Sequence, residues 1–343
     1  MQFRQVVDAL AKGASVTLSS VVDGFDAIAV ADLARGLARS GEGRSVVLAH
    51  VSRDGARQAR MEAALGFVAP DLETLSFPGW DCQPYDRVSP NAGVSAARMT
   101  ALARLARTRS GERPRILLTS VDAMLQRVIP RRRMEAQTFS AKAGDAVDTD
   151  RVTAWLEANG FLRTGTVRDV GEYAVRGGII DLYAGSMAQP VRLDFFGDTL
   201  ETIRAFDPES QRSTERMPAL DLVPMSEVTL TSEAISRFRQ GYINAFGAVT
   251  RGDPLYEAVS EGRRTPGVEH WLPLFQDGMD SLLAYLDDAP IVLDALAEDA
   301  AGERLAQVTD YFQSRRSALE QGLAGGAPYK PLTPSSLLSL IHI

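Results

Sequence analysis

The sequence holds one cysteine, Cys82, and only three lysines among its 343 residues. A single cysteine excludes a disulfide framework and a cysteine-based metal site. No apolar run approaches the roughly 18 to 20 residues that a membrane-spanning helix needs. The first residues also lack the apolar segment of a signal peptide. We therefore expect a cytoplasmic protein with no membrane partner.

Neither length nor composition points to an unusual class of protein. A chain of this length is too long for one hydrophobic core, so two or three domains are expected. Hydrophobic residues make up 45% and charged residues 24%, as is ordinary for a globular protein. The net charge of −7 excludes a surface that is basic all over, as a general nucleic-acid binder would have. A local basic patch remains compatible with it.

Short apolar runs at 45–50, 115–120 and 290–295 are typical of buried parallel strands. Residues 25–37, before the first run, and 94–107, between the first two, carry apolar side chains at helical spacing. Strands that alternate with helices predict a parallel α/β layer. The run at 290–295 could rejoin that layer, which would make the residues between an insertion.

The pattern of strands alternating with helices ends after residue 137. One helix, with Asp148 or Thr149 as its cap, precedes a series of alternating segments, and Gly197-Asp198 is a hairpin signal between two of them. These features predict a small antiparallel α+β unit, with strands near 170–176, 178–184, 190–196 and 199–206. The expected domains are 1–137 and 224–325 as two halves of the α/β domain, 138–223 as the insertion, and 326–343 as a linker and tail.

The chain gives little sign of catalysis or of a cofactor. The position where a phosphate-binding loop would follow a first strand, before the helix at 25–37, has no lysine, and Asp23 and Asp26 would repel phosphate. His50 and His270 are interpreted as structural, and the acidic residues show no metal-ligand spacing. Tyr85 and Asp86 are interpreted as shaping a loop. We expect no cofactor in this chain and no enzyme activity of its own.

A basic stretch stands out in this acidic protein. Residues 98–133 hold ten arginines against Glu112 and Asp122. Arg131, Arg132 and Arg133 could clamp phosphates of a nucleic acid. The alternative is a solvated face, and no aromatic residues interleave the arginines as a stacking platform would require.

Alternation along the strand "PVRLDFF" puts Arg192, Asp194 and Phe196 on one face and the apolar side chains on the other. Arg176 precedes a Gly-Gly bend on the neighbouring strand. An aromatic ring between guanidinium groups is typical of a protein–protein hot spot. The alternative is that another part of the chain covers Phe196. Residues 138–223 hold nine Lys/Arg and fourteen Asp/Glu, which disfavours a nucleic-acid partner for this unit.

Three segments resemble the UvrB-related N-terminal region of the bacterial transcription-repair coupling factors: "FPGWDCQPYDRVSP", "GEYAVRGGIIDLY" and "VRLDFFGDTLETIRAFDPESQRS". The similarity extends from about Val16 to Leu337. The degenerate phosphate-loop position and the lack of an aromatic-rich hairpin after "PYDRVSP" favour a coupling factor over the helicase UvrB. The alternative is a UvrB-type helicase or nucleic-acid-binding fragment that uses the basic stretch.

The resemblance implies that the α/β layer is a degenerate helicase-like (RecA-like) domain in two halves, interrupted by an insertion similar to domain 2 of UvrB. It implies that this insertion, 138–223, recruits UvrA, with Arg176, Arg192 and Phe196 at the contact. It implies that the C-terminal domain of the full protein masks this surface. RNA polymerase, DNA, ATP and Mg would bind downstream domains, which make the full protein an ATP-dependent DNA translocase. The end of the chain, "LSLIHI" at 338–343, is interpreted as non-native sequence at a truncation; a short natural apolar end is the alternative.

Overall fold

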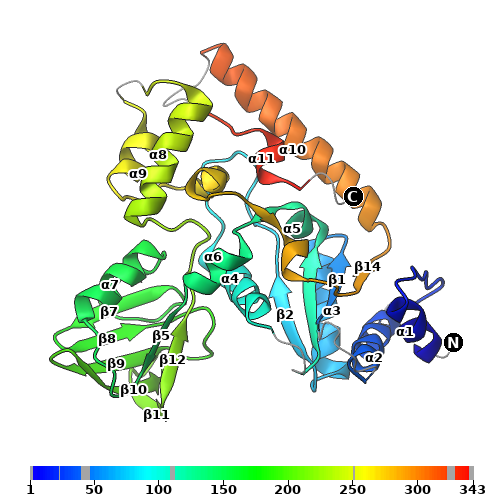
Figure 1. The fold of residues 1–343 in the computed structure, drawn as a ribbon, viewed down its shortest axis with the longest axis horizontal. Helices are drawn as coiled ribbons and strands as arrows, with labels where there is room; N and C mark the ends of the chain where they lie inside the picture. Colours follow the sequence, from blue (N-terminus) through cyan, green and yellow to red (C-terminus); the bar gives the residue numbers. More distant parts are fainter. Residues whose placement is uncertain are drawn as a thin grey trace.

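The computed structural model describes residues 3–22, 24–39, 47–108, 113–249, 252–322 and 329–339. A parallel sheet and a mainly antiparallel sheet lie side by side. A long helix, α10 (Ala297–Glu320), runs past the parallel sheet on the side away from the antiparallel one (Figure 1). The predicted fold class, a parallel α/β layer interrupted by an antiparallel α+β unit, is confirmed.

The parallel sheet has the strand order β14-β1-β3-β2. Its strands are β1 (Val47–Ser52), β2 (Glu73–Phe77), β3 (Arg115–Ser120) and β14 (Ile291–Leu293). All residues of β1 and β3 are buried, which explains the apolar runs Val47–Ala49 and Ile116–Leu118 at their centres. Because β14 pairs with β1 across Ala49 and Ile291, the chain returns to its first sheet after the insertion, as predicted.

Helices cover both faces of this sheet. The helices of the first half are α1 (Phe3–Ala11), α2 (Phe25–Arg39), α3 (Gly55–Val68), α4 (Ala92–Ala106), α5 (Val121–Leu125) and α6 (Arg131–Ala136). Leu48 and Ile116 share a core with α2 and α3, whereas Ala49 and Leu117 share the core of the opposite face with α4 and α5. The strand period of two thus separates the two cores.

The segment after the insertion adds helices to the α4 side. It contains α8 (Ser232–Phe246), α9 (Pro254–Ser260), the 3-10 helices η1 (Val268–Phe275) and η2 (Leu282–Tyr285), α10, and α11 (Pro334–Leu337). Phe238 stacks on Phe275 with 4.8 Å between ring centres. A short strand, β13 (Asp280–Ser281), pairs with β4 (Arg127–Val128) and joins the two halves.

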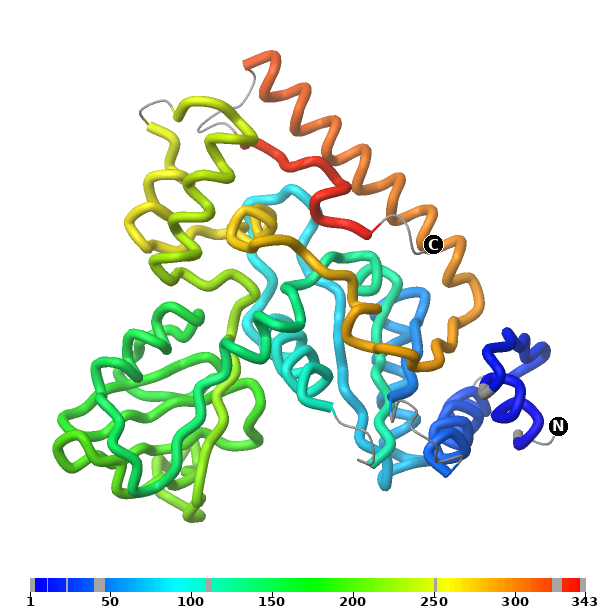
Figure 2. Tube along the Cα trace, viewed as in Figure 1, coloured from blue at the N-terminus to red at the C-terminus, as the bar shows by residue number. Residues whose placement is uncertain are grey.

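The inserted unit is a six-stranded sheet of order β11-β10-β9-β8-β7-β6, packed on α7 (Thr149–Ala158). Its strands are β6 (Leu162–Arg163), β7 (Glu172–Arg176), β8 (Ile179–Leu182), β9 (Val191–Phe196), β10 (Thr199–Phe206) and β11 (Ser213–Met217). At its neck, β5 (Phe139–Lys142) pairs with β12 (Ala219–Leu222), so the chain enters and leaves side by side (Figure 2).

Several expectations need correction. Ile291 and Leu293 of β14 are exposed, because β14 is the edge strand of the sheet. The prediction that residues 290–295 form a strand of the first sheet is confirmed, but the prediction that this strand is buried is wrong. Residues 14–22, which precede α2, form no strand. The strand expected before the phosphate-loop position is therefore absent from this described segment. The long helix α10 was not predicted. Only Ala297, Ala301 and Val308 of it are buried, too few for an apolar stripe in the sequence.

Part of the segment interpreted as a linker is packed. Tyr329 and Leu332 are buried, and Lys330 forms an ion pair with Asp253, 2.9 Å between nitrogen and oxygen. Further on, the backbone nitrogen of Ser339 donates to the carbonyl oxygen of Leu125. Residues 340–343, most of the suspected tail, lie outside the described residues.

The insertion packs closely on the parallel domain at Gly185, after β8. A Cβ atom on Gly185 would lie 2.4 Å from the Cβ of Ala96 on α4. We expect Gly185→Ala to lower the free energy of unfolding by about 1–3 kcal/mol, because the added methyl group would force the segment after β8 and helix α4 apart. Gly165→Ala, where a Cβ meets nothing within 4 Å, is the matched control. Equal urea midpoints for the two variants would contradict this packing.

Candidate partner-binding surface

The side of the antiparallel sheet that faces away from α7 is called here the outer face. The strand period of two places on it Ala174, Arg176, Ile179, Asp181, Arg192, Asp194, Phe196, Thr202, Arg204, Phe206 and Arg216. The opposite set, including Val191 and Leu193, builds the core with α7. The alternation predicted along β9 is therefore confirmed.

Phe196 is the most exposed large apolar side chain of this unit, with 77% of its surface accessible. It ends β9 directly before the hairpin residue Gly197, whose φ of 57° is the left-handed conformation that glycine favours. The turn Gly177-Gly178 lies beside it, because Phe195 donates to the carbonyl oxygen of Gly178. No described part of the chain covers the ring, so the covering alternative fails for these residues.

Arg192 is held rigidly and is less exposed than alternation alone suggests. Its guanidinium donates to both carboxylate oxygens of Asp181, at 2.7 and 2.9 Å, and lies 4.9 Å from the ring centre of Phe206. The Asp181 hydrogen bonds raise the pKa of Arg192 above its usual value. One fifth of the side chain remains accessible. Arg192 thus presents a fixed cationic edge.

Arg176 lies at the end of β7 and is exposed. Its Nη2 atom donates to the carbonyl oxygen of Gly165 at 2.8 Å and to the hydroxyl of Thr166. Arg176 and Arg192 share the outer face but stand two strands apart, about 10 Å by strand spacing. The three predicted residues therefore outline one surface without touching one another.

Two further arginines of the outer face were missed. Arg204 lies opposite Arg192 on β10, and Arg216 lies opposite Arg204 on β11. Arg204 forms an ion pair of 3.1 Å with Asp194. Alternation along "STERM" could have found Arg216, but the irregular register between Leu200 and Thr202 obscures the pattern along β10.

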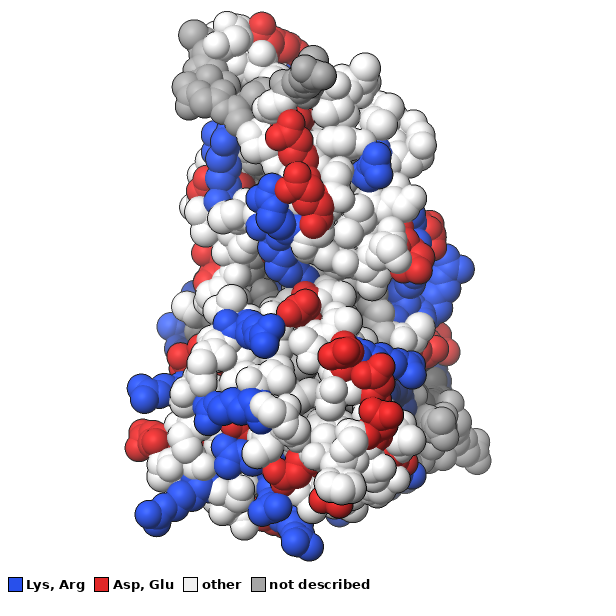
Figure 3. Space-filling model, turned by 90° about the vertical axis from the view of Figure 1, so that its left-hand side faces the viewer, with Lys and Arg blue, Asp and Glu red and all other residues white. Residues whose placement is uncertain are grey.

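The outer face is cationic although its domain is acidic. Four arginines stand on it against Asp181, Asp194 and Glu172, which shares the face with Arg176 on β7, and both aspartates are engaged by arginines. Figure 3 views the molecule from the side of this domain, where basic and acidic side chains are interspersed over the visible face. The outer face is thus suited to a partner with carboxylates around an apolar pocket.

The arginines of the basic stretch are mostly engaged by acidic residues. Arg131 pairs with Asp287 at 2.8 Å, and Arg133 pairs with Asp277. Arg132 is exposed on the same helix, α6. Arg98 is fully buried against Glu227. Surface carboxylates thus pair with two of the three arginines on α6, and α6 is separate from the outer face.

The start of α2 is occupied by its own carboxylate. Asp26 accepts hydrogen bonds from the backbone nitrogens of Gly24 and Ala27, and it also pairs with Arg57. These backbone groups are the ones a phosphate would use at a helix N-terminus. The other predicted repelling residue, Asp23, lies outside the described residues. Within the described ranges, no group of three or more His, Cys, Asp or Glu is placed to hold a metal ion.

The fold and the outer face define a protein-interaction domain set into an α/β layer. Residues 139–228 match the family model of the UvrB interaction domain. No helix in the described part of the chain is long and apolar enough to cross a membrane.

Over most of its length the chain is similar to transcription-repair-coupling factors. The protein of Haemophilus influenzae is 30% identical over 92% of this chain, and that of Escherichia coli 29% identical over 79%. That of Myxococcus xanthus is 36% identical over 67% of this chain. The matched parts are 26%, 23% and 20% of these relatives, so the chain spans about a quarter of their length. The resemblance seen in the sequence motifs is confirmed.

Proposed function

We propose that residues 138–223 form the UvrA-recruiting domain of a transcription-repair coupling factor. The observation that carries the proposal is the exposed ring of Phe196 on a rigid, arginine-lined sheet face. Apolar side chains that are exposed singly are common, but this ring lies on a sheet face between guanidinium groups, which is the arrangement typical of a protein–protein hot spot. The matched family model supports this reading of the domain.

Within the longer protein, this domain would bring UvrA to RNA polymerase stalled at DNA damage. DNA translocation driven by ATP and Mg would belong to domains outside this chain, and the C-terminal domain of that protein would mask the outer face. The α/β layer would serve as a scaffold without ATPase activity. The UvrB-type nucleic-acid alternative is not adopted, because acidic partners occupy Arg131 and Arg133.

Truncating Phe196 should weaken UvrA binding by about 2 kcal/mol, or about 30-fold in Kd. Arg176→Ala and Arg192→Ala should each act in the same direction with similar size. The measurement is a titration of purified UvrA with each variant by calorimetry. Circular dichroism and urea midpoints confirm that the variants are folded.

The chain offers matched controls. Phe67 on α3 is even more exposed than Phe196 and belongs to the other domain, so Phe67→Ala should leave the Kd unchanged. Arg263, which is exposed beside Glu261, is the control for the arginines. If Phe196→Ala and Phe67→Ala bind UvrA equally well, the surface assignment is wrong.

A further inference from the structure

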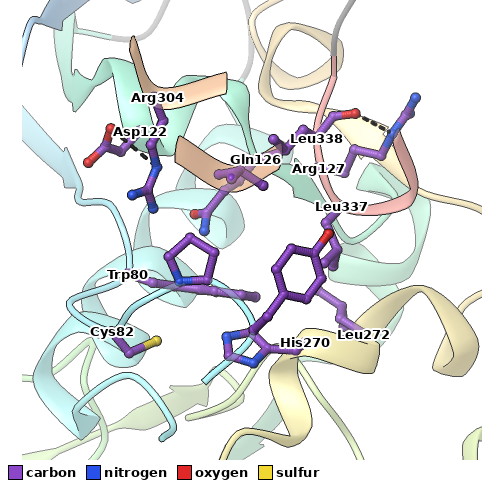
Figure 4. A pocket seen from close by; sticks show the side chains of 13 residues that line it. Trp80, Cys82, Asp122, Gln126, Arg127, His270, Leu272, Arg304, Leu337 and Leu338 are labelled. Atoms are coloured by element: carbon purple, nitrogen blue, oxygen red, sulfur yellow. Dashed lines mark hydrogen bonds and ion pairs between the residues drawn. The ribbon is translucent and has the colours of Figure 1, made fainter. Parts of the chain in front are cut away.

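A small cavity lies beside Tyr85 in the parallel domain, where five distant segments meet (Figure 4). It encloses about 30 Å³, room for about two water molecules. The hydroxyl of Tyr85, the side-chain oxygen of Gln126 and Nε2 of His270 are buried there without a partner among the described residues. Because a polar space of this size suits water, we interpret the cavity as a hydration site of the core.

The outer face of the antiparallel sheet is partly covered by a loop of its own domain. Residues 164–171, called here the β6–β7 loop, fold back over it between strands β6 and β7. Their anchor is Val167, which is fully buried and shares a small core with Ala174 and Phe206 of the outer face. The residues directly before and after the anchor are exposed. One apolar contact therefore holds the middle of the loop against the sheet.

The carboxylate of Glu172 fixes the conformation of the β6–β7 loop. One of its oxygens accepts from the backbone nitrogens of Arg168 and Asp169, at 2.7 and 3.0 Å. A side-chain oxygen that accepts from nearby backbone nitrogens stabilises a turn. Although Glu172 stands on the outer face, its carboxylate is thus engaged by the loop, which follows one defined course over the sheet.

Both arginines of the proposed UvrA contact rest on this loop, from different sides. Arg176 donates to two groups at its start, the carbonyl oxygen of Gly165 and the hydroxyl of the next residue. Arg192 lies over the ring of Phe206, and that ring packs against Val167 of the loop. The loop thus bridges two side chains that stand two strands apart and do not touch each other.

Gln211, in the turn between β10 and β11, completes this bridge. Its side-chain nitrogen donates to the carbonyl oxygen of Val167 at 3.0 Å and to that of Pro208 at 2.7 Å. Its own backbone carbonyl oxygen accepts from Nη1 of Arg192 at 3.4 Å. Gln211 therefore connects the loop that supports Arg176 with the guanidinium of Arg192.

The backbone at Gln211 has a conformation that glutamine rarely adopts. Its φ of 59° is left-handed, a region in which glycine is preferred and asparagine is tolerated. Glycine has no side chain to reach the carbonyl oxygen of Val167, and the side chain of asparagine is shorter by one methylene group. Backbone strain at a residue whose long side chain makes the bridging contact is typical of a functional position.

We propose that Gln211 is a positioning residue of the partner-binding surface. Together with the β6–β7 loop it holds Arg176 and Arg192 in one arrangement, so that the two arginines act as a unit. Guanidiniums that are in place before the encounter spare the complex the entropy cost of ordering them. For its partner the proposal rests on the UvrA-recruiting function proposed above, whereas the arrangement itself is a property of the free chain.

The arrangement is tested first in the free chain, by heteronuclear NMR. Gln211→Met keeps the length of the side chain and removes its donor, so we expect it to shift or broaden the Nε–H signal of Arg192 and the backbone amide signals of the β6–β7 loop. Gln240→Met is the matched control, because the Gln240 amide donates to Asn244 on the surface of α8, and it should move none of these signals. If the two variants leave the signals equally unchanged, Gln211 positions nothing.

UvrA binding gives the second readout, by calorimetry with the purified protein. Gln211→Met should weaken binding about three- to tenfold, the effect of one or two lost hydrogen bonds, and Gln240→Met should leave the Kd unchanged. Phe196→Ala should cost the same factor in the Gln211→Met background as in the unaltered chain, because Phe196 pairs with Thr199 at the end of β10 opposite Phe206. A general loss of structure would reduce that factor.

The coupling between the two arginines separates positioning from a merely structural role. In the unaltered chain, Arg176→Ala and Arg192→Ala together should weaken binding by less than the product of the two single factors, because the first truncation already loosens the shared support. In the Gln211→Met background the two factors should multiply. Factors that multiply in both backgrounds, or a Kd that Gln211→Met leaves unchanged, would overturn the proposal. An unaltered chain that does not bind UvrA would instead defeat the proposed function, and the NMR comparison would still decide the arrangement.

Discussion

Replacing Glu227 with alanine should lower the free energy of unfolding by about 3–5 kcal/mol, because it leaves the Arg98 guanidinium buried without a counter-charge. Both side chains are almost inaccessible to water, and Arg98 contacts both carboxylate oxygens of Glu227. Trp80 also donates to this carboxylate through Nε1, at 3.2 Å. The loss is measured by urea unfolding followed through tryptophan fluorescence.

The remaining contacts of Arg98 cannot compensate for that loss. Its guanidinium donates to the carbonyl oxygen of Pro78 at 2.8 Å and lies 4.2 Å from the ring centre of Phe77. Neither neutralises a charge. The double variant Arg98→Met, Glu227→Leu replaces the pair by apolar side chains of similar size and should recover most of the stability. A loss below about 1 kcal/mol in Glu227→Ala would show that water reaches Arg98.

This ion pair has an architectural consequence. Glu227 lies just after β12, where the chain leaves the inserted domain, whereas Arg98 lies on α4 of the first half. The pair therefore fixes the exit of the insertion to the parallel domain, near the close approach of Gly185 to Ala96. A rigid attachment would give the outer face a defined direction relative to the rest of the chain.

Local patterns in the sequence predicted the elements that carry the outer face. Period-two alternation along β9 separated Phe196 from the core residues that pack on α7, but it left open whether another part of the chain covers the ring; the exposure of the ring is known from the structure. These features depend on residues close together in the chain, where spacing and capping are visible.

Pairings between distant residues could not be read in the same way. Arg98 was counted among surface arginines, yet its partner Glu227 is 129 positions away. The apolar residues of β14 suggested burial, but exposure at a sheet edge depends on which strand lies next to it. The cavity at Tyr85 joins five segments, so composition near "QPYDRV" showed only a loop.

The second large effect is expected at Asp253, which ties the end of the described chain to α9. Its carboxylate caps α9 through the backbone nitrogen of Tyr256, accepts from the buried hydroxyl of Tyr242 at 2.8 Å, and pairs with Lys330. Asp253→Ala should lower the free energy of unfolding by about 3 kcal/mol, through the lost cap and the unpaired hydroxyl. Asp253→Asn keeps the cap of α9 through its single amide oxygen, but its NH2 group replaces the oxygen that accepts from Tyr242 and Lys330, so this variant removes the charge together with that acceptor.

The charge of Asp253 makes part of this stability depend on pH. Burial alone would raise the pKa of Asp253, but hydrogen bonds from Lys330, Tyr242 and Tyr256 outweigh it and lower the pKa below that of the unfolded chain. The folded state therefore binds its proton less readily, and the stabilisation is complete above the unfolded pKa of about 4. It is lost as the pH falls through the lower, folded value. We expect a constant stability difference between the unaltered chain and Asp253→Asn from pH 7 to 5, which narrows below pH 4 in urea titrations. A difference that stays constant down to pH 3 would mean that Lys330 does not hold the carboxylate ionised.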